Sequence, residues 1–194
     1  MKFYTATLQS QTKYQQSAPV GLPKLDRETA DAYEERTWIE RGHWSSNGYG
    51  FIPPQAFKIG LTSAAKFMGM QIPGKGKSTY TKHFQSGIMI SEPIALQHTR
   101  ETVEKVRLFV PSDGVAGSGK RVWKIFPVFP EWHGDLQITV LDEIITGKVL
   151  AQTIEGMGKF IGIGAFRPQS GGYFGRFDLK RLVGPDGEVK LDMA

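Results

Sequence analysis

Two segments with helical periodicity, each set between strand-like segments, constrain the fold of this chain most. The first, residues 54–68, begins after Pro53, and a proline pair at 53–54 suits the entrance to a helix. The second lies at about 146–160. Apolar residues recur at helical spacing in both, as Phe57, Leu61, Ala64 and Met68 and as Leu150, Ile154, Met157 and Ile161. These stripes predict two helices that pack on the core.

Alternating apolar residues predict the strands of a sheet. KFYTATLQS (2–10) begins the sheet with Tyr4, Ala6 and Leu8 on one side, and DLQITVLD (135–142) and FDLKRLV (177–183) follow the same pattern. IMISEPIAL and VRLFVP also predict strands. RVWKIFPVFPEW (121–132) is strand-like, and its prolines favour a position at a sheet edge.

The order of these segments is β, helix, β, several strands, then β, helix, β. It is typical of an α+β fold, a ferredoxin-like or RRM-like antiparallel sheet with two core helices. We expect a single RRM-like domain over residues 1–194, with long loop or hairpin insertions at about 20–50 and 70–125. Within the first insertion, LDRETADAYEERTWIER (25–41) predicts a helix on the surface or against a partner, with i,i+4 pairs Arg27–Asp31 and Arg36–Glu40.

Composition excludes several classes of function. The chain has 194 residues and no cysteine, which rules out disulfides, thiolate metal sites and a cysteine nucleophile. The N-terminus has no apolar signal-peptide core, and no apolar run approaches 18 residues. We therefore expect a cytoplasmic protein without a membrane partner.

The basic residues are segregated along the chain. The net charge is +5, and residues 42–91 contain five lysines and no acid, whereas residues 24–41 contain six acids and four bases. Such segregation suits a polyanionic partner. A surface that simply lacks acids is the alternative explanation.

Three glycine-rich stretches mimic nucleotide-binding loops and fail in detail. GVAGSGK (114–120) is followed by Arg121, where a P-loop needs Ser or Thr, and then by a strand. GKGKST (74–79) has Gln71 where the first glycine belongs. In GKFIGIGAFRPQSGGYFGRFDL (158–179), Arg167 stands at the third glycine position of the dinucleotide fingerprint, and the run follows a helix. We expect no nucleotide cofactor.

The histidines give little support for catalysis. His43, His83, His98 and His133 show no HxxxH or HExxH spacing, so no metal site is expected. His83 or His43 acting as acid-base in a metal-independent ribonuclease is an alternative, and nothing near Asp113 supports a catalytic role for it. We expect no catalytic residue and no enzyme activity.

Three clusters instead interleave cations with aromatic rings, the combination that binds single-stranded nucleic acid through phosphates and stacked bases. The first comprises Lys75, Lys77, Tyr80, Lys82, His83 and Phe84, beside the candidates Lys58 and Lys66 of the neighbouring helix; the second comprises Lys120, Arg121, Trp123 and Lys124; the third comprises Lys159, Arg167, Tyr173, Phe174 and Arg176. Lys58 and Lys66 share a face of the helix at 54–68, where solvated lysines are the alternative. Tyr80, Trp123, Tyr173 and Phe174 are expected to stack on bases, whereas Phe160, Phe166 and Phe177 are expected to face the core.

Three segments resemble the RAMP superfamily: FIPPQAFKIGLTSAAKF, LQITVLDEIITGKVLAQTIEGMGKF and IGIGAFRPQSGGYFGRFDL. The first is similar to the family's I-P-G-S-S-[LF]-K-G segment, with Pro54 in place of the glycine. The resemblance implies a modified RRM fold like that of the repeating backbone subunits of CRISPR effector complexes. It also implies a glycine-rich loop against bound RNA, here Gly162, Gly164, Gly171, Gly172 and Gly175, whose backbone amides come close to the strand.

The resemblance further implies head-to-tail assembly, with a protruding element of each subunit lying over its neighbour. Residues 70–90 or 111–122 are the candidates for that element, and the acidic helix at 25–41 is a candidate to meet a neighbour's basic face. In its overall look the chain is similar to small proteins encoded by bacteriophages and prophages, which act in the bacterial host cell.

The sequence thus predicts a non-catalytic binder of single-stranded RNA or DNA that coats the strand as a helical oligomer. A metal-independent endoribonuclease of the same superfamily, and a phage structural or host-interaction protein, are the alternatives.

Overall fold

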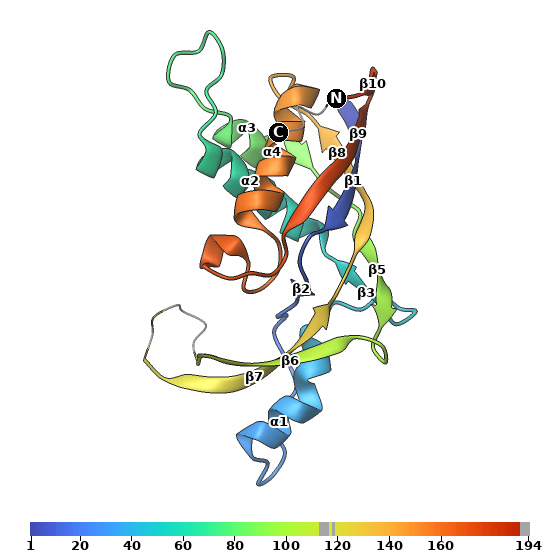
Figure 1. Cartoon of the computed structure of the whole chain (residues 1–194), viewed down its shortest axis with the longest axis vertical. Coiled ribbons are helices and arrows are strands. Elements are labelled where there is room, and N and C mark those ends of the chain that lie inside the picture. Colours follow the sequence, from blue (N-terminus) through green and yellow to red (C-terminus); the bar gives the residue numbers. More distant parts are fainter. Residues whose placement is uncertain (113–116, 118, 191–194) are drawn as a thin grey trace.

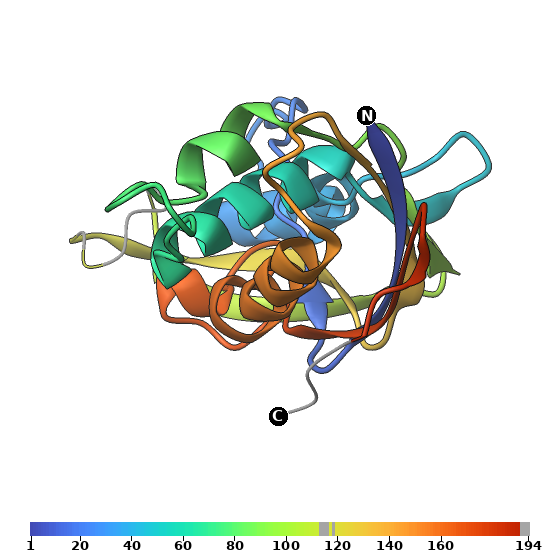
Figure 2. The ribbon, with the colours of Figure 1, turned by 90° about the horizontal axis from the view of Figure 1, so that it is seen from above.

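The computed structural model describes residues 1–112, 117 and 119–190, and a five-stranded antiparallel sheet forms its centre (Figure 1). The strand order is β10-β9-β1-β8-β4. The strands are β1 (Lys2–Ser10), β4 (Ile88–Met89), β8 (His133–Val140), β9 (Phe177–Gly184) and β10 (Gly187–Glu188). Helices α2 (Pro54–Met68) and α4 (Gly147–Gly156) cover one face, as Figure 2 shows from above. Through β1, α2, β4, β8, α4 and β9 the chain follows the predicted β-α-β-β-α-β order.

The core lies between the sheet and the two helices. Tyr4, Ala6 and Leu8 are buried on β1, in agreement with the predicted alternation. Helix α2 starts at Pro54 after the extended Pro53, so the proline pair forms the helix entrance as predicted. Helices α2 and α4 approach closely, because each contributes a glycine that faces a methionine. Gly60 faces Met157, which follows α4, and Gly156 faces Met68.

The remaining strands form two smaller sheets. One has the order β2-β7-β6 and comprises β2 (Tyr14–Gln15), β6 (Glu104–Pro111) and β7 (Arg121–Phe129); the other pairs β3 (Tyr49–Ile52) with β5 (Ile94–Thr99). Strands β6 and β7 form a long hairpin that projects to one side (Figure 1).

Strand β7 is central in its sheet, so the predicted edge position is wrong. Its pairing with β6 continues through Pro127, which lies opposite Lys105. The Pro127 carbonyl accepts a hydrogen bond from the Gln16 amide just beyond the end of β2, so the proline nitrogen also faces that side. The missing N–H therefore falls where pairing with β2 has ended.

The acidic segment folds as α1 (Ala30–Thr37) followed by a 3₁₀ turn, η1 (Trp38–Arg41), and packs against β7. The predicted pairs Arg27–Asp31 and Arg36–Glu40 do not form, because Arg27 precedes the helix and the acids pair elsewhere. The pairs that form are Arg36–Glu28, Arg41–Glu34, Lys105–Glu35, Arg107–Asp31 and Arg100–Glu40. Lys105 and Arg107 belong to β6, so the acidic helix meets basic residues of its own chain.

Within the described part of the chain, no helix combines the length and the apolar character needed to cross a bilayer.

Candidate nucleic-acid interface

The three predicted clusters lie along one side of the molecule. The loop before α3 (Thr81–Ser86), the loop that follows α4, and the free end of the β6–β7 hairpin all reach the left side in both Figure 1 and Figure 2. In Figure 1 they follow one another along the long axis, with the α3 loop at the top and the hairpin at the bottom. Segments separated by up to about a hundred residues in sequence therefore share one side.

The exposed lysines of these clusters keep their charge free. Among the described residues, no carboxylate pairs with the exposed lysines Lys66, Lys75, Lys77, Lys82 and Lys159. Lys120 and Arg121 are also exposed, and Lys124 is half-buried and donates to the Ser112 carbonyl over 3.4 Å. Lys75 interacts electrostatically with Asp142, and none of these lysines forms an ion pair with a described acid, so the site presents largely uncompensated positive charge.

Cations elsewhere behave differently. Lys13, Lys105, Lys180 and Arg181 each pair with a carboxylate, at distances between 2.6 and 3.0 Å. Like the arginines around α1, these cations are paired with carboxylates of the same chain. Among the described residues, most of the cations without an ion pair therefore lie in the segments that the sequence singled out, with Lys2 and Lys24 among the exceptions.

The first cluster contains two residues that the structure places in structural roles. Tyr80 is 6% exposed and belongs to the core, so its predicted role in base stacking is wrong. Lys58 Nζ donates to the carbonyls of Phe84 (2.8 Å) and Gln85 (3.0 Å), near the C-terminus of α3, and burial lowers the Lys58 pKa. The insertion predicted from about residue 70 as a loop or hairpin is partly helical, because it contains α3. Phe84 of α3 is buried, and this short helix packs against α2.

His83 is held by an acid. Its Nδ1 lies 2.6 Å from Asp142 Oδ2, just beyond β8, and this hydrogen bond holds the pKa of Asp142 below its usual range. His43, the other histidine considered for acid-base chemistry, has a pKa lowered by burial and contacts the Phe51 ring. No group of three or more His, Asp or Glu suited to a metal occurs in the described ranges.

The second cluster is part of a four-residue stack on the hairpin. Phe109 lies opposite Trp123 with ring centroids 5.1 Å apart, and both rings are about half exposed. The Arg107 guanidinium lies 5.0 Å from the Trp123 ring and that of Arg121 lies 5.4 Å from the Phe109 ring. Sequence reasoning missed Arg107 and Phe109, although pairing VRLFVP with RVWKIF as a hairpin would have placed them beside Trp123.

In the third cluster the glycines serve packing within the chain. A Cβ at Gly164 would meet the Gln15 carbonyl of β2, and one at Gly175 would meet the Ile163 carbonyl. Both glycines also have positive φ, at 76° and 78°. Backbone amides of the loop bond within the chain: those of Ile163, Ala165, Gly172, Phe174 and Gly175 donate to Gly175, Gln15, Arg167, Phe166 and Lys13 carbonyls. Of the glycine amides expected to contact a strand, those of Gly162, Gly171, Gly172 and Gly175 are thus bonded within the chain, so the expectation is wrong for these four.

The aromatic residues of this loop divide differently from the prediction. Phe177 is buried against Phe57 and Trp132 as expected, and Phe166 is half-buried against Phe126. Phe160 is 50% exposed, so its predicted core position is wrong. The reason is local, because the chain leaves α4 through a π-helical turn, η2 (Met157–Ile161), that buries Met157 and Ile161 and turns Phe160 outward.

The two arginines of the loop are half-buried and brace its backbone. Arg167 donates from Nε to Gln169 Oε1 at 3.2 Å and from Nη1 to the Gly164 carbonyl at 3.3 Å. Arg176 Nη1 donates to the Lys159 carbonyl. Neither guanidinium is paired with a described carboxylate. Both therefore keep a positive charge at this surface while they hold the loop.

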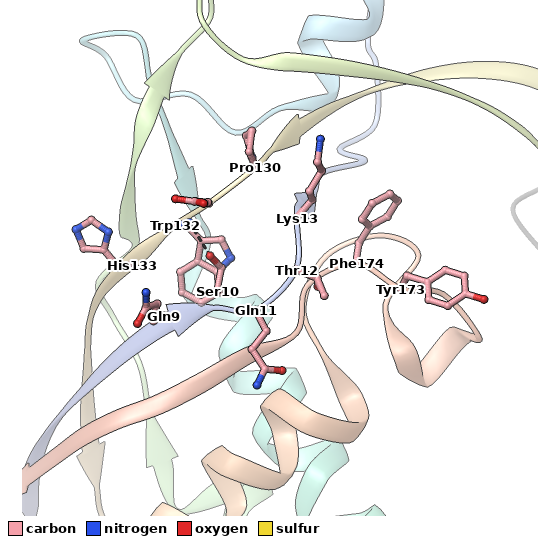
Figure 3. Close-up of a pocket in the computed structure, with 11 residues that line it drawn as sticks. Gln9, Ser10, Gln11, Thr12, Lys13, Pro130, Trp132, His133, Tyr173 and Phe174 are labelled. Carbon is pink, nitrogen blue, oxygen red and sulfur yellow. Dashed lines mark hydrogen bonds between the residues drawn. The ribbon is translucent and has the colours of Figure 1, made fainter.

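Tyr173, with 83% of its surface exposed, and the half-buried Phe174 stand at the rim of a groove of about 480 Å³ (Figure 3). The floor and opposite wall come from the end of β1 and the β7–β8 connection: Gln9, Ser10, Gln11, Thr12, Lys13, Pro130, Glu131, Trp132 and His133. Amide, hydroxyl and imidazole groups thus line the groove together with the Glu131 carboxylate and the Lys13 ammonium. Sequence reasoning missed this wall, because its residues show no motif and meet only in the fold.

The open face of the main sheet has a different character. Thr5 Oγ1 donates to Gln137 Oε1 (2.9 Å) and Thr7 Oγ1 donates to Asp135 Oδ1 (2.7 Å). RRM domains stack bases on aromatic residues at the equivalent face. Here polar side chains are bonded to one another and one is acidic, which disfavours a polyanion, although the exposed ring of Phe3 lies on the same face of β1.

No protein-family model matches the chain, and no curated protein sequence matches it. Solved structures do match in shape. One is a chain in the cryo-EM structure of the Type III-B Cmr-beta complex bound to cognate target RNA, with a TM-score of 0.52 and 10% identity. The match covers 94% of this chain and 60% of that chain.

A chain of a CRISPR RNA-guided surveillance complex matches with a TM-score of 0.40 and 11% identity, over 98% of this chain and 71% of the other. The present chain spans less than two thirds of the Cmr-beta chain. The likeness to the Cmr-beta chain shows the fold alone, and it is consistent with the RRM-like arrangement predicted from the sequence.

Proposed function

We propose that this protein is a non-catalytic binder of single-stranded nucleic acid, either RNA or ssDNA. The bound strand runs along the side of the protein that carries the three clusters. The observation that carries the proposal is the unpaired charge of Lys66, Lys75, Lys77, Lys82 and Lys159 on that side. Unpaired lysines bind phosphate at no cost in broken ion pairs. Phosphate contacts of this kind supply affinity for any sequence.

Aromatic residues complete the chemistry. Trp123 and Tyr173 are exposed and belong to the hairpin and to the glycine-rich loop, two segments that both reach the left side in Figure 1. Stacking on such rings is tolerant of base identity. Arg121 covers part of the Phe109 ring, and no described carboxylate pairs with it, so its charge can attract a phosphate next to a stacked base. Arg107 covers part of the Trp123 ring but is paired with Asp31.

We further propose head-to-tail assembly along the strand, with the β6–β7 hairpin as the element that reaches a neighbour. The hairpin projects beyond the body of the molecule (Figure 1). A heterologous contact of this kind yields an open helix. The fold shared with a chain of the RNA-bound Cmr-beta structure supports a backbone-type subunit of a nucleic-acid-bound assembly, and a stand-alone phage relative is the alternative.

The test measures the affinity of the protein for 30-nucleotide single strands by fluorescence anisotropy over a range of salt concentrations. The variant Lys66→Ala/Lys75→Ala/Lys77→Ala is compared with the control Lys105→Ala/Lys180→Ala/Arg181→Ala, which removes the same charge from paired positions. If all three lysines contact phosphates, the slope of log K against log salt becomes shallower by about 2, at about 0.7 per contact. Wild-type protein that binds no strand at low salt would refute the proposal.

One observation favours a second candidate, a metal-independent endoribonuclease. Asp142 orients and polarises the His83 imidazole, as an acid-base residue requires. Incubation of wild-type protein and His83→Ala with RNA in the presence of a chelator decides between the two. Cleavage by the wild type alone would replace the non-catalytic proposal, whereas intact RNA in both samples supports it. Sizing with and without oligonucleotide separately tests the phage structural alternative, which predicts no strand-dependent growth.

A further inference from the structure

Two phenyl rings lie side by side on the surface between α2 and the turn that follows α4. Phe67 is 63% exposed and Phe160 is 50% exposed, and their ring centroids are 5.3 Å apart with an angle of 33° between the planes. Phenylalanine rings are usually buried, and an exposed pair therefore indicates a site of interaction.

The rings border a hollow of about 550 Å³, which falls in the size range of small-ligand sites. Its lining residues are Ser63, Lys66, Phe67, Phe160, Ile161, Pro168 and Gln169. None of them is acidic. The hollow therefore combines two rings, one cation and one exposed amide side chain.

Each ring directly follows a lysine in the chain, as Lys66–Phe67 on α2 and Lys159–Phe160 on η2. Both lysines are exposed, and neither pairs with a carboxylate of the described residues. The fold thus brings together two copies of one cation-ring pair from segments about ninety residues apart. Charge of one sign beside an apolar pair suits a ligand that is anionic and flat.

Resting on the proposed function, we propose that Phe67 and Phe160 form a base-stacking site for the bound strand. A nucleobase packs against the ring pair, Lys66 and Lys159 hold the phosphates on either side of it, and the Gln169 amide faces the base edge. The C-terminal end of α2 and the turn with Pro168 and Gln169 meet on the left side in Figure 2, the side that carries the three clusters. A strand that joins the α3 loop to the glycine-rich loop crosses this hollow.

The experiment compares Phe67→Ala and Phe160→Ala with Phe3→Ala, a control ring that is 62% exposed on β1 of the main sheet. Each variant is titrated with a 30-nucleotide single strand and with an abasic strand of the same length. Loss of one stacked base costs about 1–3 kcal/mol, so we expect affinity for the base-containing strand to fall about 5- to 150-fold. The salt slope stays unchanged because no charge is removed, and Phe3→Ala binds as the wild type does.

Affinity for the abasic strand distinguishes stacking from a general loss of structure. Under the proposal, the wild type and both variants bind that strand equally, and Phe67→Leu, which keeps apolar bulk without a ring, shows most of the loss seen for Phe67→Ala. Equal binding of base-containing strands by the wild type and both alanine variants overturns the stacking site and leaves the proposed function intact. A change in self-association by sedimentation without nucleic acid, with strand affinity unaltered, also overturns it and assigns the ring pair to contact between copies of the chain. Failure of the wild type to bind any strand instead removes the proposed function itself.

Discussion

Glu34, which joins α1 to η1 through Arg41 and to β7 through the Ile125 amide, gives the sharpest prediction about stability. Glu34 accepts hydrogen bonds of 2.9 Å from Arg41 Nη2 and a bond of 3.1 Å from the Ile125 amide, and its side chain and that of Arg41 are each 12% exposed. Glu34→Ala leaves a nearly buried guanidinium without its counter-charge and the Ile125 amide without its acceptor. Breaking a buried pair on one side costs about 3–5 kcal/mol.

The control is the next residue in the helix. Glu35 pairs with Lys105 at 2.6 Å, but both side chains are about half exposed, and exposed pairs contribute only about 0–1 kcal/mol. Urea denaturation followed by circular dichroism gives the free energy of unfolding of both variants. We expect Glu34→Ala to lose several-fold more stability than Glu35→Ala, and to lower Tm by roughly 6–20 °C at about 2–4 °C per kcal/mol. Equal losses in the two variants would contradict the assignment of Glu34 as the residue that holds α1.

Two further predictions concern stability. A Cβ at Gly158 would meet the Phe177 carbonyl, so Gly158→Ala should lower the free energy of unfolding by about 1–3 kcal/mol in urea, while Gly21→Ala, in open space, should change it by less than about 1. His83 keeps the pKa of Asp142 low, so their hydrogen bond stabilises the fold above the ordinary aspartate pKa of about 3.9 and is lost as pH falls through the lower, folded value. Asp142→Asn should therefore be less stable at neutral pH and lose less stability on acidification, as measured by thermal melts across pH; parallel pH profiles for variant and wild type would exclude this role.

The main elements of the fold could be predicted because their signals are local. The period-two alternation of β1, β8 and β9 and the stripes on α2 and α4 are set by which face each element buries. The position of β7 within its sheet could not be predicted, because the sequence does not show that β2 pairs beside it. Strand β2 is only two residues long. The same limit applies to the acids of α1, whose partners on β6 lie about seventy residues away.

The sequence predicted which segments of the candidate site carry positive charge better than it predicted which side chains are exposed. Lys66 and Lys77 have no acid nearby in sequence and form no ion pair with a described acid in space, whereas Lys75 interacts electrostatically with Asp142. Rings were harder to assign. Tyr80 and Phe160 exchanged their expected roles, since the short helix α3 buries the first and the π turn exposes the second, and neither event has a sequence signal as strong as an amphipathic stripe.

The docking of α1 onto β6 also shapes how the molecule meets its surroundings. Because that contact neutralises the acids against basic residues of the hairpin base, the uncancelled positive charge is left on one side of the protein. An asymmetric charge distribution of this kind gives the molecule an electric dipole, which orients it in the field of an approaching polyanion before contact. Its effect is on the association rate, which is expected to fall steeply with ionic strength, while the half-life of the complex is set by contacts formed after the molecule has been oriented.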